Sequence, residues 1–350
     1  MAQAKKKQLP KDFESRLEQC DLQELRTIFD ACDVNARGGY SKQTALAFAQ
    51  CPDELARWLV EHGADLAAGD SYGDTPLHSR SSHWKGRIEV LLELGADANH
   101  GENTRGTPLH SAAGSYRTAS AALLLRHGAR IDALNQEGQT PLAYALQRCA
   151  NAQIQDMAEL AELFLAAGAR QTPEMSEFVT RIGTNFEFHR GGFNPDSVEA
   201  TSATLDKLYI LFGATPVPRR LLHDGQSPIV ARSASWEDQH HELWELLVPS
   251  RGSAGTVQGE VVRIAGRIRD ELERNGGANW DRAYRRMADV FLVHIGSGTP
   301  LTESLLTEAH ETVEELNRKK GDTRRLCELA AKWVSLNPTP LKLPAPDYDR

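Results

Sequence analysis

Short apolar runs recur at even intervals along the first half of the chain, and a glycine follows each of them. The runs RWLVEH, VLLEL, ALLLRH and LFLAA precede Gly63-Ala64-Asp65, Gly95-Ala96-Asp97, Gly128-Ala129-Arg130 and Gly168-Ala169-Arg170. A glycine after an apolar run of this length is typical of a helix end, because glycine readily adopts the left-handed conformation that closes the last turn. The pattern therefore predicts a series of short helices.

A second motif keeps a fixed phase with the first. Thr75-Pro76-Leu77-His78 recurs as Thr107-Pro108-Leu109-His110 and Thr140-Pro141-Leu142-Ala143, with a weaker copy at Thr44-Ala45-Leu46-Ala47. Threonine caps a helix, proline fits its first turn, and leucine enters the core between stacked units. The threonines are 31, 32 and 33 residues apart, so the chain contains an internal repeat.

Two motifs in fixed phase at this period resemble the ankyrin repeat, in which T-P-L-H opens the first helix and G-A-D closes the second. The resemblance implies an all-α fold, with an ankyrin-repeat solenoid followed by an α-helical C-terminal domain. His78 and His110 take the repeat's histidine position, where the side chain ties one turn to its neighbour. These motif residues have structural duties and are not candidate functional residues.

The repeat extends beyond its clear copies. An apolar stretch at 22–29 with a closing turn at 31–36 implies an incomplete N-terminal unit that begins near Asp12. The fourth repeat has surplus residues around 149–156, which predicts a longer helix or loop. A fifth, degenerate unit ends in LDKLYILFGA, whereas its middle, FHRGGFNPDS, is loop-like.

The region after residue 234 has a different pattern. Apolar spacing near three and four predicts helices at 236–248, 257–275, 280–294, 302–319 and 323–336, with Val261, Ile264, Ile268 and Leu272 on one stripe. LVPSRGSAGTVQGE and NGGANWDRAYRRM resemble a segment of uncharacterised bacterial proteins. This bundle is interpreted as a second interaction module or as a block that shields the end of the solenoid.

These patterns divide the chain into five parts. We expect a disordered basic N-terminus at 1–11, the solenoid at 12–215 with clear repeats at 37–170 and the degenerate unit at 171–215, a linker or irregular join at 216–234, the helical domain at 235–337, and an extended tail at 338–350.

Composition narrows the function classes. No apolar run approaches the roughly 20 residues that span a bilayer, and the basic start MAQAKKKQLPKDFE lacks the apolar stretch of a signal peptide. We therefore expect a cytoplasmic protein with no membrane partner. Five scattered cysteines without a C-x-x-C pair argue against disulfides and a zinc site. A net charge of -8 and few basic runs disfavour nucleic acid as a partner.

The sequence supports no catalytic residue, metal or cofactor. His240-His241-Glu242-Leu243-Trp244-Glu245 lacks the second histidine of an H-E-x-x-H metal motif. Glycine-rich segments lack the residues of a phosphate-binding loop, and no serine lies in a G-x-S-x-G elbow. An alternative remains, in which the repeats target a catalytic helical domain. Its only candidate residues are His240, His241, Glu242, Glu245, Glu260 and Asp281.

The ankyrin resemblance implies a binding surface on the hairpin tips and first helices, which line the concave face of such solenoids. The corresponding tip positions are Tyr40, Ser41, Gln43, Ser71, Tyr72, Asp74, Asn103, Thr104, Gln136, Glu137 and Gln139. The corresponding positions near the first helices are Ser82, His83, Trp84, Ser115, Tyr116, Arg117, Gln147 and Arg148. Tyrosine, tryptophan and arginine are enriched at binding hot spots. The alternative is that Trp84, Tyr116 and Tyr144 fill gaps between repeats.

These features predict a non-enzymatic protein that recognises a partner protein and sequesters, scaffolds or inhibits it. By analogy, a bacterial immunity protein that neutralises a toxin fits this description. The alternatives are the effector or enzyme with a catalytic C-terminal domain, and an adaptor whose two regions hold different partners.

Overall fold

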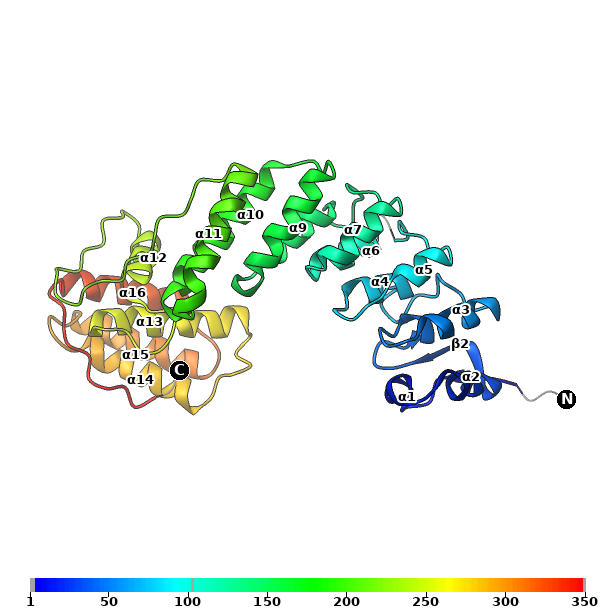
Figure 1. The fold of residues 1–350 in the computed structure, drawn as a ribbon. Helices are drawn as coiled ribbons and strands as arrows, with labels where there is room; N and C mark the ends of the chain where they lie inside the picture. The colour runs from blue at the N-terminus through cyan, green and yellow to red at the C-terminus, as the bar shows by residue number, and fades with distance from the viewer. Residues whose placement is uncertain (1–3, 102–103, 349–350) are drawn as a thin grey trace. The chain divides into compact units, whose positions relative to one another are not determined.

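The computed structural model describes residues 4–101 and 104–348, and its chain forms two compact units (Figure 1). The first comprises Met1–Asn185 and Pro195–Val217, and the second Phe186–Asn194 and Pro218–Arg350. The division falls within helix α10 (Pro173–His189), so residues 186–194, which we expected in the solenoid, group with the second unit. None of the described helices combines the length and apolar character needed to cross a bilayer.

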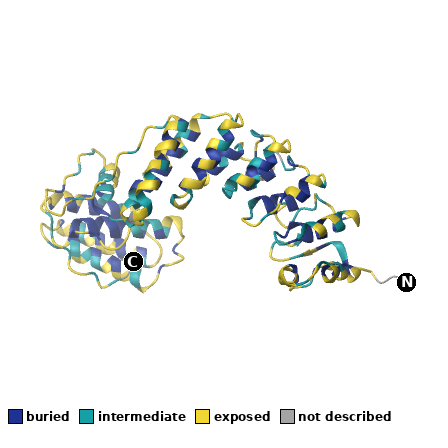
Figure 2. Ribbon diagram, viewed as in Figure 1, coloured by how far each residue is buried: buried dark blue, intermediate teal, exposed yellow. Residues whose placement is uncertain are grey.

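Short helices stacked in chain order build the first unit, and their buried faces lie toward neighbouring helices (Figure 2). They are η1 (Ala45–Ala47), α3 (Asp53–Glu61), α4 (Pro76–Ser82), α5 (Glu89–Glu93), α6 (Pro108–Gly114), α7 (Thr118–Arg126), α8 (Pro141–Arg148), η2 (Asn151–Gln153) and α9 (Ile154–Ala166). The surplus residues of the fourth repeat lie both in the loop with η2 and in the 13-residue helix α9.

The helix ends have the chemistry that the repeat predicts. Thr75, Thr107 and Thr140 are the N-caps of α4, α6 and α8, and a proline follows each in the first turn. Gly95, after α5, has a φ of +94°, which favours glycine over residues with a Cβ atom. In the weaker copy, Ala45 replaces proline and the first helix is reduced to the single 3₁₀ turn η1.

The N-terminal end differs from the expected pattern in two places. Residues 6–8, expected to be disordered, form strand β1 (Lys6–Gln8), and residues 32–36, expected to be a turn, begin strand β2 (Cys32–Gly38). These strands pair in parallel, and β2 pairs antiparallel with β3 (Gln43–Thr44). Burial of Leu9 and Phe13 just after β1 explains why this segment is held in place.

Two helices follow β1 before the first repeat. They are α1 (Phe13–Gln19) and α2 (Leu22–Ala31), and the second covers the apolar stretch predicted at 22–29. Asp21 and Glu24 form a reciprocal capping box at the start of α2.

The degenerate fifth unit consists of two long helices, α10 and α11 (Pro195–Phe212), joined through η3 (Arg190–Gly192). The segment FHRGGFNPDS is therefore only partly a loop, because α10 continues to His189. At Gly183 an added Cβ would lie 1.8 Å from the Tyr209 hydroxyl, so the two helices approach closely. Gly213 ends the pair with a φ of +60°.

The second unit contains the five helices predicted from apolar spacing. They are α12 (Trp236–Leu247), α13 (Val257–Arg269) with one π-helical turn η4 (Asp270–Arg274), α14 (Arg282–Ile295), α15 (Glu303–Asn317) and α16 (Thr323–Leu336). Helix α13 is central, since it packs against α12, α14 and α16. Val261, Ile264 and Ile268 of the predicted stripe are fully buried, and Leu272 is half-buried.

The segments that flank this bundle are extended but hydrogen-bonded to it. Arg220 donates to the carbonyl oxygens of Trp244 and Val248 at 2.9 and 2.8 Å. The Gln258 side chain donates to the Asn337 carbonyl at 2.8 Å and accepts from the Leu341 amide at 3.0 Å. The chain after α16 is therefore fixed along the N-terminal end of α13.

A buried arginine joins the first two repeats. Arg80 has no exposed surface, and its guanidinium donates to the carbonyl oxygens of Leu46 at 2.7 Å, Arg87 at 3.0 Å and Cys51 at 3.4 Å. Leu46 and Cys51 are buried, so without Arg80 their carbonyl groups would lose a donor away from water, which is costly. At Leu46, Arg80 thus supplies the donor that the shortened helix η1 lacks.

We predict that Arg80→Met lowers the free energy of unfolding of the first unit by about 2–4 kcal/mol, because buried carbonyl groups lose their donor. Urea unfolding and amide hydrogen exchange over residues 44–61 measure this. The control is Arg57→Met, which removes an exposed ion pair with Glu93 and should change little. Equal stability of Arg80→Met and the unmodified chain would contradict the assigned role.

Candidate partner-binding surface

The hairpin tips of neighbouring repeats are fixed in line with one another. Within one tip, the Asp70 carboxylate accepts hydrogen bonds from the Tyr72 and Asp74 amides at 2.8 and 3.1 Å. Between tips, the Ser71 amide donates to the Ser41 carbonyl at 2.8 Å, and the Gln136 amide donates to the Thr104 carbonyl at 2.5 Å. The tips therefore form a row with defined backbone geometry.

Most predicted tip residues reach the surface. Tyr40 is 95% exposed and Tyr72 49% exposed. Ser71, Thr104, Gln136 and Glu137 are exposed, whereas Ser41, Gln43, Asp74 and Gln139 are half-buried. Asn103 lies outside the described residues. Arg105, which was not among the predicted positions, lies 5.3 Å over the Tyr72 ring and supports its orientation.

Trp84 follows the end of α4 and is 68% exposed, so it does not fill a gap between repeats. Its ring lies parallel to that of His83 at 6.1 Å between centroids, and the Lys85 amine lies 4.7 Å from the ring centroid. Ser82 and His83 are half-buried. The result is an exposed aromatic surface with a cation beside it.

Tyr116 and Arg117 have structural contacts that the sequence did not reveal. The Tyr116 hydroxyl donates to the Ala145 carbonyl at 3.2 Å, and burial raises the pKa of this phenol. The Arg117 Nε donates to the Ser82 carbonyl at 3.3 Å. Both side chains are half-buried and connect neighbouring repeats.

Tyr144 also packs between repeats, as the alternative proposed. An added Cβ at Gly114 would lie 2.5 Å from its ring, so Tyr144 covers this glycine closely. The guanidinium carbon of Arg148 lies 5.1 Å from the centroid of the Tyr144 ring. Gln147 and Arg148 are exposed, and Ser115 is half-buried. Of the three aromatic residues with two interpretations, only Trp84 is available to a partner over most of its surface.

His78 and His110 have the structural role that the sequence indicated. The His78 Nδ1 contacts the Thr75 hydroxyl at 2.8 Å, and its Nε2 lies 3.1 Å from the Gly106 carbonyl. The His110 Nε2 lies 3.0 Å from the Gln139 carbonyl in the same arrangement. Burial lowers the pKa of His78, which keeps it in the neutral form that both contacts require.

Of the six residues of the enzyme alternative, three line one cavity and three do not. His240, His241 and Glu245 line a cavity of about 210 Å³ between α12 and α13. The Glu242 carboxylate instead accepts from the Arg232 and Ser233 amides at 2.9 and 3.1 Å. Glu260 is buried in an ion pair, and Asp281 caps α14.

The carboxylates that line this cavity are already engaged. Glu245 pairs with Arg220 at 2.8 Å, Glu237 with Arg324 at 2.9 Å, and Asp270 lies 3.6 Å from Arg274. A carboxylate that contacts an arginine is less available to a substrate or a metal ion. Among the described residues, no group of three or more His, Cys, Asp or Glu side chains is arranged to hold a metal ion.

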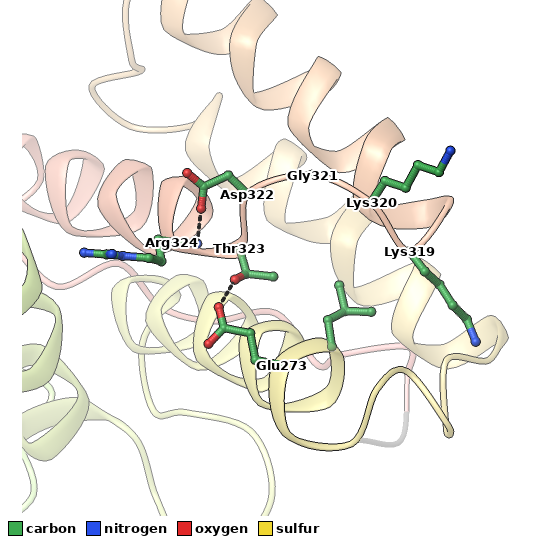
Figure 3. Close-up of a pocket in the computed structure, with 8 residues that line it drawn as sticks. Glu273, Lys319, Lys320, Gly321, Asp322, Thr323 and Arg324 are labelled. Atoms are coloured by element: carbon green, nitrogen blue, oxygen red, sulfur yellow. Dashed lines mark hydrogen bonds between the residues drawn. The ribbon is translucent and has the colours of Figure 1, made fainter.

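A second cavity, of about 270 Å³, lies beside the turn between α15 and α16 (Figure 3). The Asp322 carboxylate caps α16 by accepting from the Arg324 amide at 2.9 Å, and Thr323 donates to Glu273. Lys319 donates to the Gly277 carbonyl at 2.8 Å. These contacts stabilise the helix end and explain the cluster of charges without a ligand.

Burial of His240 gives the second unit a pH dependence. His240 is 3% exposed, and burial, with the nearby Arg269 charge, lowers its pKa to about 4. The unfolded chain binds a proton at this residue below about pH 6.5, whereas the folded chain does not. The stability that neutral His240 contributes to the second unit is therefore fully present above about pH 6.5, and it is lost as the pH decreases toward about 4.

We predict that the free energy of unfolding of the second unit falls by about 3 kcal/mol between about pH 6.5 and pH 4, and that His240→Gln removes most of this loss. Urea unfolding at a series of pH values measures it. The matched control, His241→Gln, changes an exposed neighbour and should retain the loss. An undiminished loss in His240→Gln would assign the pH dependence to other groups.

Part of the first unit is similar to known ankyrin repeats. Residues 81–172 match the family model for ankyrin repeats (3 copies). A solved ankyrin repeat domain from Acinetobacter baumannii is 21% identical, with a TM-score of 0.42, and the alignment covers 58% of this chain and 98% of that one. No curated protein sequence matches the chain. The match confirms the predicted ankyrin repeats over residues 81–172, and such repeats are protein–protein interaction modules. The helices of the described residues confirm the predicted helical fold.

Proposed function

We propose that this ankyrin-repeat protein is a non-enzymatic binding protein that holds one partner protein on its hairpin tips and on the segments after its first helices. The observation that carries this proposal is the set of exposed aromatic side chains, Tyr40, Tyr72 and Trp84, on tips and turns with fixed backbone positions. Rigid aromatic side chains offer contact area at a low entropic cost. Binding of this kind sequesters, scaffolds or inhibits the partner.

The free state of the cysteines supports a cytoplasmic location for this binding. All five are unpaired thiols, and Cys32, Cys51, Cys149 and Cys327 are buried. The resemblance of the C-terminal region to bacterial proteins supports a bacterial setting. In that setting, an immunity protein that neutralises a cognate toxin is an instance of the proposed function by analogy.

The test is an affinity pull-down with mass spectrometry from cells that express the chain, with the intact protein and a Tyr40→Ala, Tyr72→Ala, Trp84→Ala variant. We expect the intact chain to retain a stoichiometric partner and the variant to bind it at least about 30-fold more weakly, as loss of one hot spot of about 2 kcal/mol implies. Arg117 is left unchanged because its contact with Ser82 is structural.

The matched control removes exposed apolar side chains elsewhere. Ile210→Ala, Leu221→Ala, Val293→Ala changes three residues that are 81%, 76% and 69% exposed. Circular dichroism establishes that both variants remain folded. If the control loses the partner and the aromatic variant retains it, binding lies on another face and the proposal fails.

A further inference from the structure

Acidic residues are absent from three stretches of the repeats. Residues 75–88, 103–131 and 138–155 contain no Asp or Glu, although the chain as a whole has 48 of them and a net charge of -8. The same stretches contain eight Lys or Arg residues. They cover the first helices of three successive repeats and the turns that follow, so this charge bias has a defined place in the fold.

Hydrogen bonds bring the ends of these helices together. Arg117 reaches the Ser82 carbonyl at the end of α4, and Tyr116 reaches Ala145 in α8. Arg181 of α10 continues the series by donating to the Leu146 carbonyl at 3.2 Å. Helix α6 also packs directly against both α4 and α8. The cations at these ends therefore lie on one face of the first unit.

We define the cationic row as Lys85, Arg117, Arg148 and Arg181. Within residues 4–101 and 104–348, none of the four forms an ion pair with a carboxylate, whereas Arg87 nearby pairs with Asp53 at 3.2 Å. Lys85 and Arg148 also donate no side-chain hydrogen bond within the same residues. Each instead lies over an aromatic ring, Trp84 and Tyr144 respectively.

The edge of the row is acidic. Burial raises the pKa of Tyr116 and Cys149, and the charge of Asp156, in the first turn of α9, adds to this effect while Arg181 opposes it. The helices α3, α5, α9 and α11 carry acidic residues on their sequences. An acidic ligand would be repelled from those surfaces and attracted to the row, which gives its binding both a place and an orientation.

We infer that the cationic row binds an acidic segment of the partner protein, with carboxylate side chains on Lys85 and Arg148 and an apolar side chain on Trp84. This inference rests on the proposed function and specifies the chemistry of its partner. Arginine presents a planar group of donors that matches a carboxylate, and the aromatic rings beneath the cations restrict their positions. A polypeptide fits better than nucleic acid, because a long polyanion would meet the acidic remainder of the chain.

The probe is a phage-displayed library of random twelve-residue peptides, selected on the full chain. Selection is repeated on the Lys85→Glu, Arg148→Glu variant. Its matched control is Arg126→Glu, Lys207→Glu, which makes the same change in net charge at exposed positions outside the row. Synthetic versions of the selected peptides and the oligonucleotide dT12 are then titrated by fluorescence anisotropy at low and high salt.

We expect the peptides selected on the full chain to contain more Asp and Glu than Lys and Arg. Their affinity should fall at least about tenfold in the row variant and with added salt, and by less than about twofold in the control. Circular dichroism checks that each variant is folded.

Several results would overturn this inference. They are peptides without an acidic excess, no selected peptide, equal loss in row and control variants, or tighter row-dependent binding of dT12 than of any peptide. Some selected peptides could lack an acidic excess and still lose their binding in the Tyr40→Ala, Tyr72→Ala, Trp84→Ala variant. That result would reject the acidic segment and leave the proposed function standing. Failure of that function is judged separately, by the partner pull-down.

Discussion

Each repeat of the first unit buries its apolar faces mainly against its neighbours, so backbone carbonyl groups at every junction need donors from the next repeat. Several side-chain types supply them. His78 spans to Gly106, Arg80 reaches back to Leu46, and Asn99 connects the turn after α5 with the Gly128 carbonyl at 3.0 Å. The stacking of the repeats, and with it the line of hairpin tips, depends on these contacts.

The local part of this fold was predictable from the sequence. Threonine caps, proline in the first turn and glycine after the second helix act within a few residues, so their spacing predicted the helix pairs. Pairing of Lys6–Gln8 with Cys32–Gly38 was not predictable, since it joins segments far apart in the chain and has no periodic signal. Residues 6–8 were therefore wrongly expected to be disordered.

The candidate site was predictable only as a set of positions. Trp84, Tyr116 and Arg117 belong to residue types that favour interfaces, and the sequence offers no means of separating them. Separation depends on backbone direction and on the neighbouring repeat. Tyr116 has a φ of +57°, which places its ring against the next repeat, whereas Trp84 follows the end of α4 and stays exposed. Lys85 was not among the predicted positions, because its signal is the lack of Asp and Glu around it and not its residue type.

The arginine side chains of the two units have different partners, and this difference limits where a cation can bind a ligand. In the second unit, Arg220, Arg263, Arg286 and Arg325 each form an ion pair with a carboxylate at 2.8 Å or less. In the same order, these pairs stabilise the irregular join before α12, the buried part of α13, the C-terminal segment and the packing of α15 against α16.

Arginines of the first unit more often serve carbonyl groups or lie over rings, as Arg80 and Arg148 do. A carbonyl compensates a guanidinium only in part, because it carries no net charge. The cations at the repeat junctions can therefore stabilise the stack and still attract a carboxylate from outside. In this fold, Arg117 and Arg181 donate to carbonyl groups at the junctions, whereas Lys85 and Arg148 lie over aromatic rings near the same helix ends, so both kinds of cation contribute to the positive charge of the row.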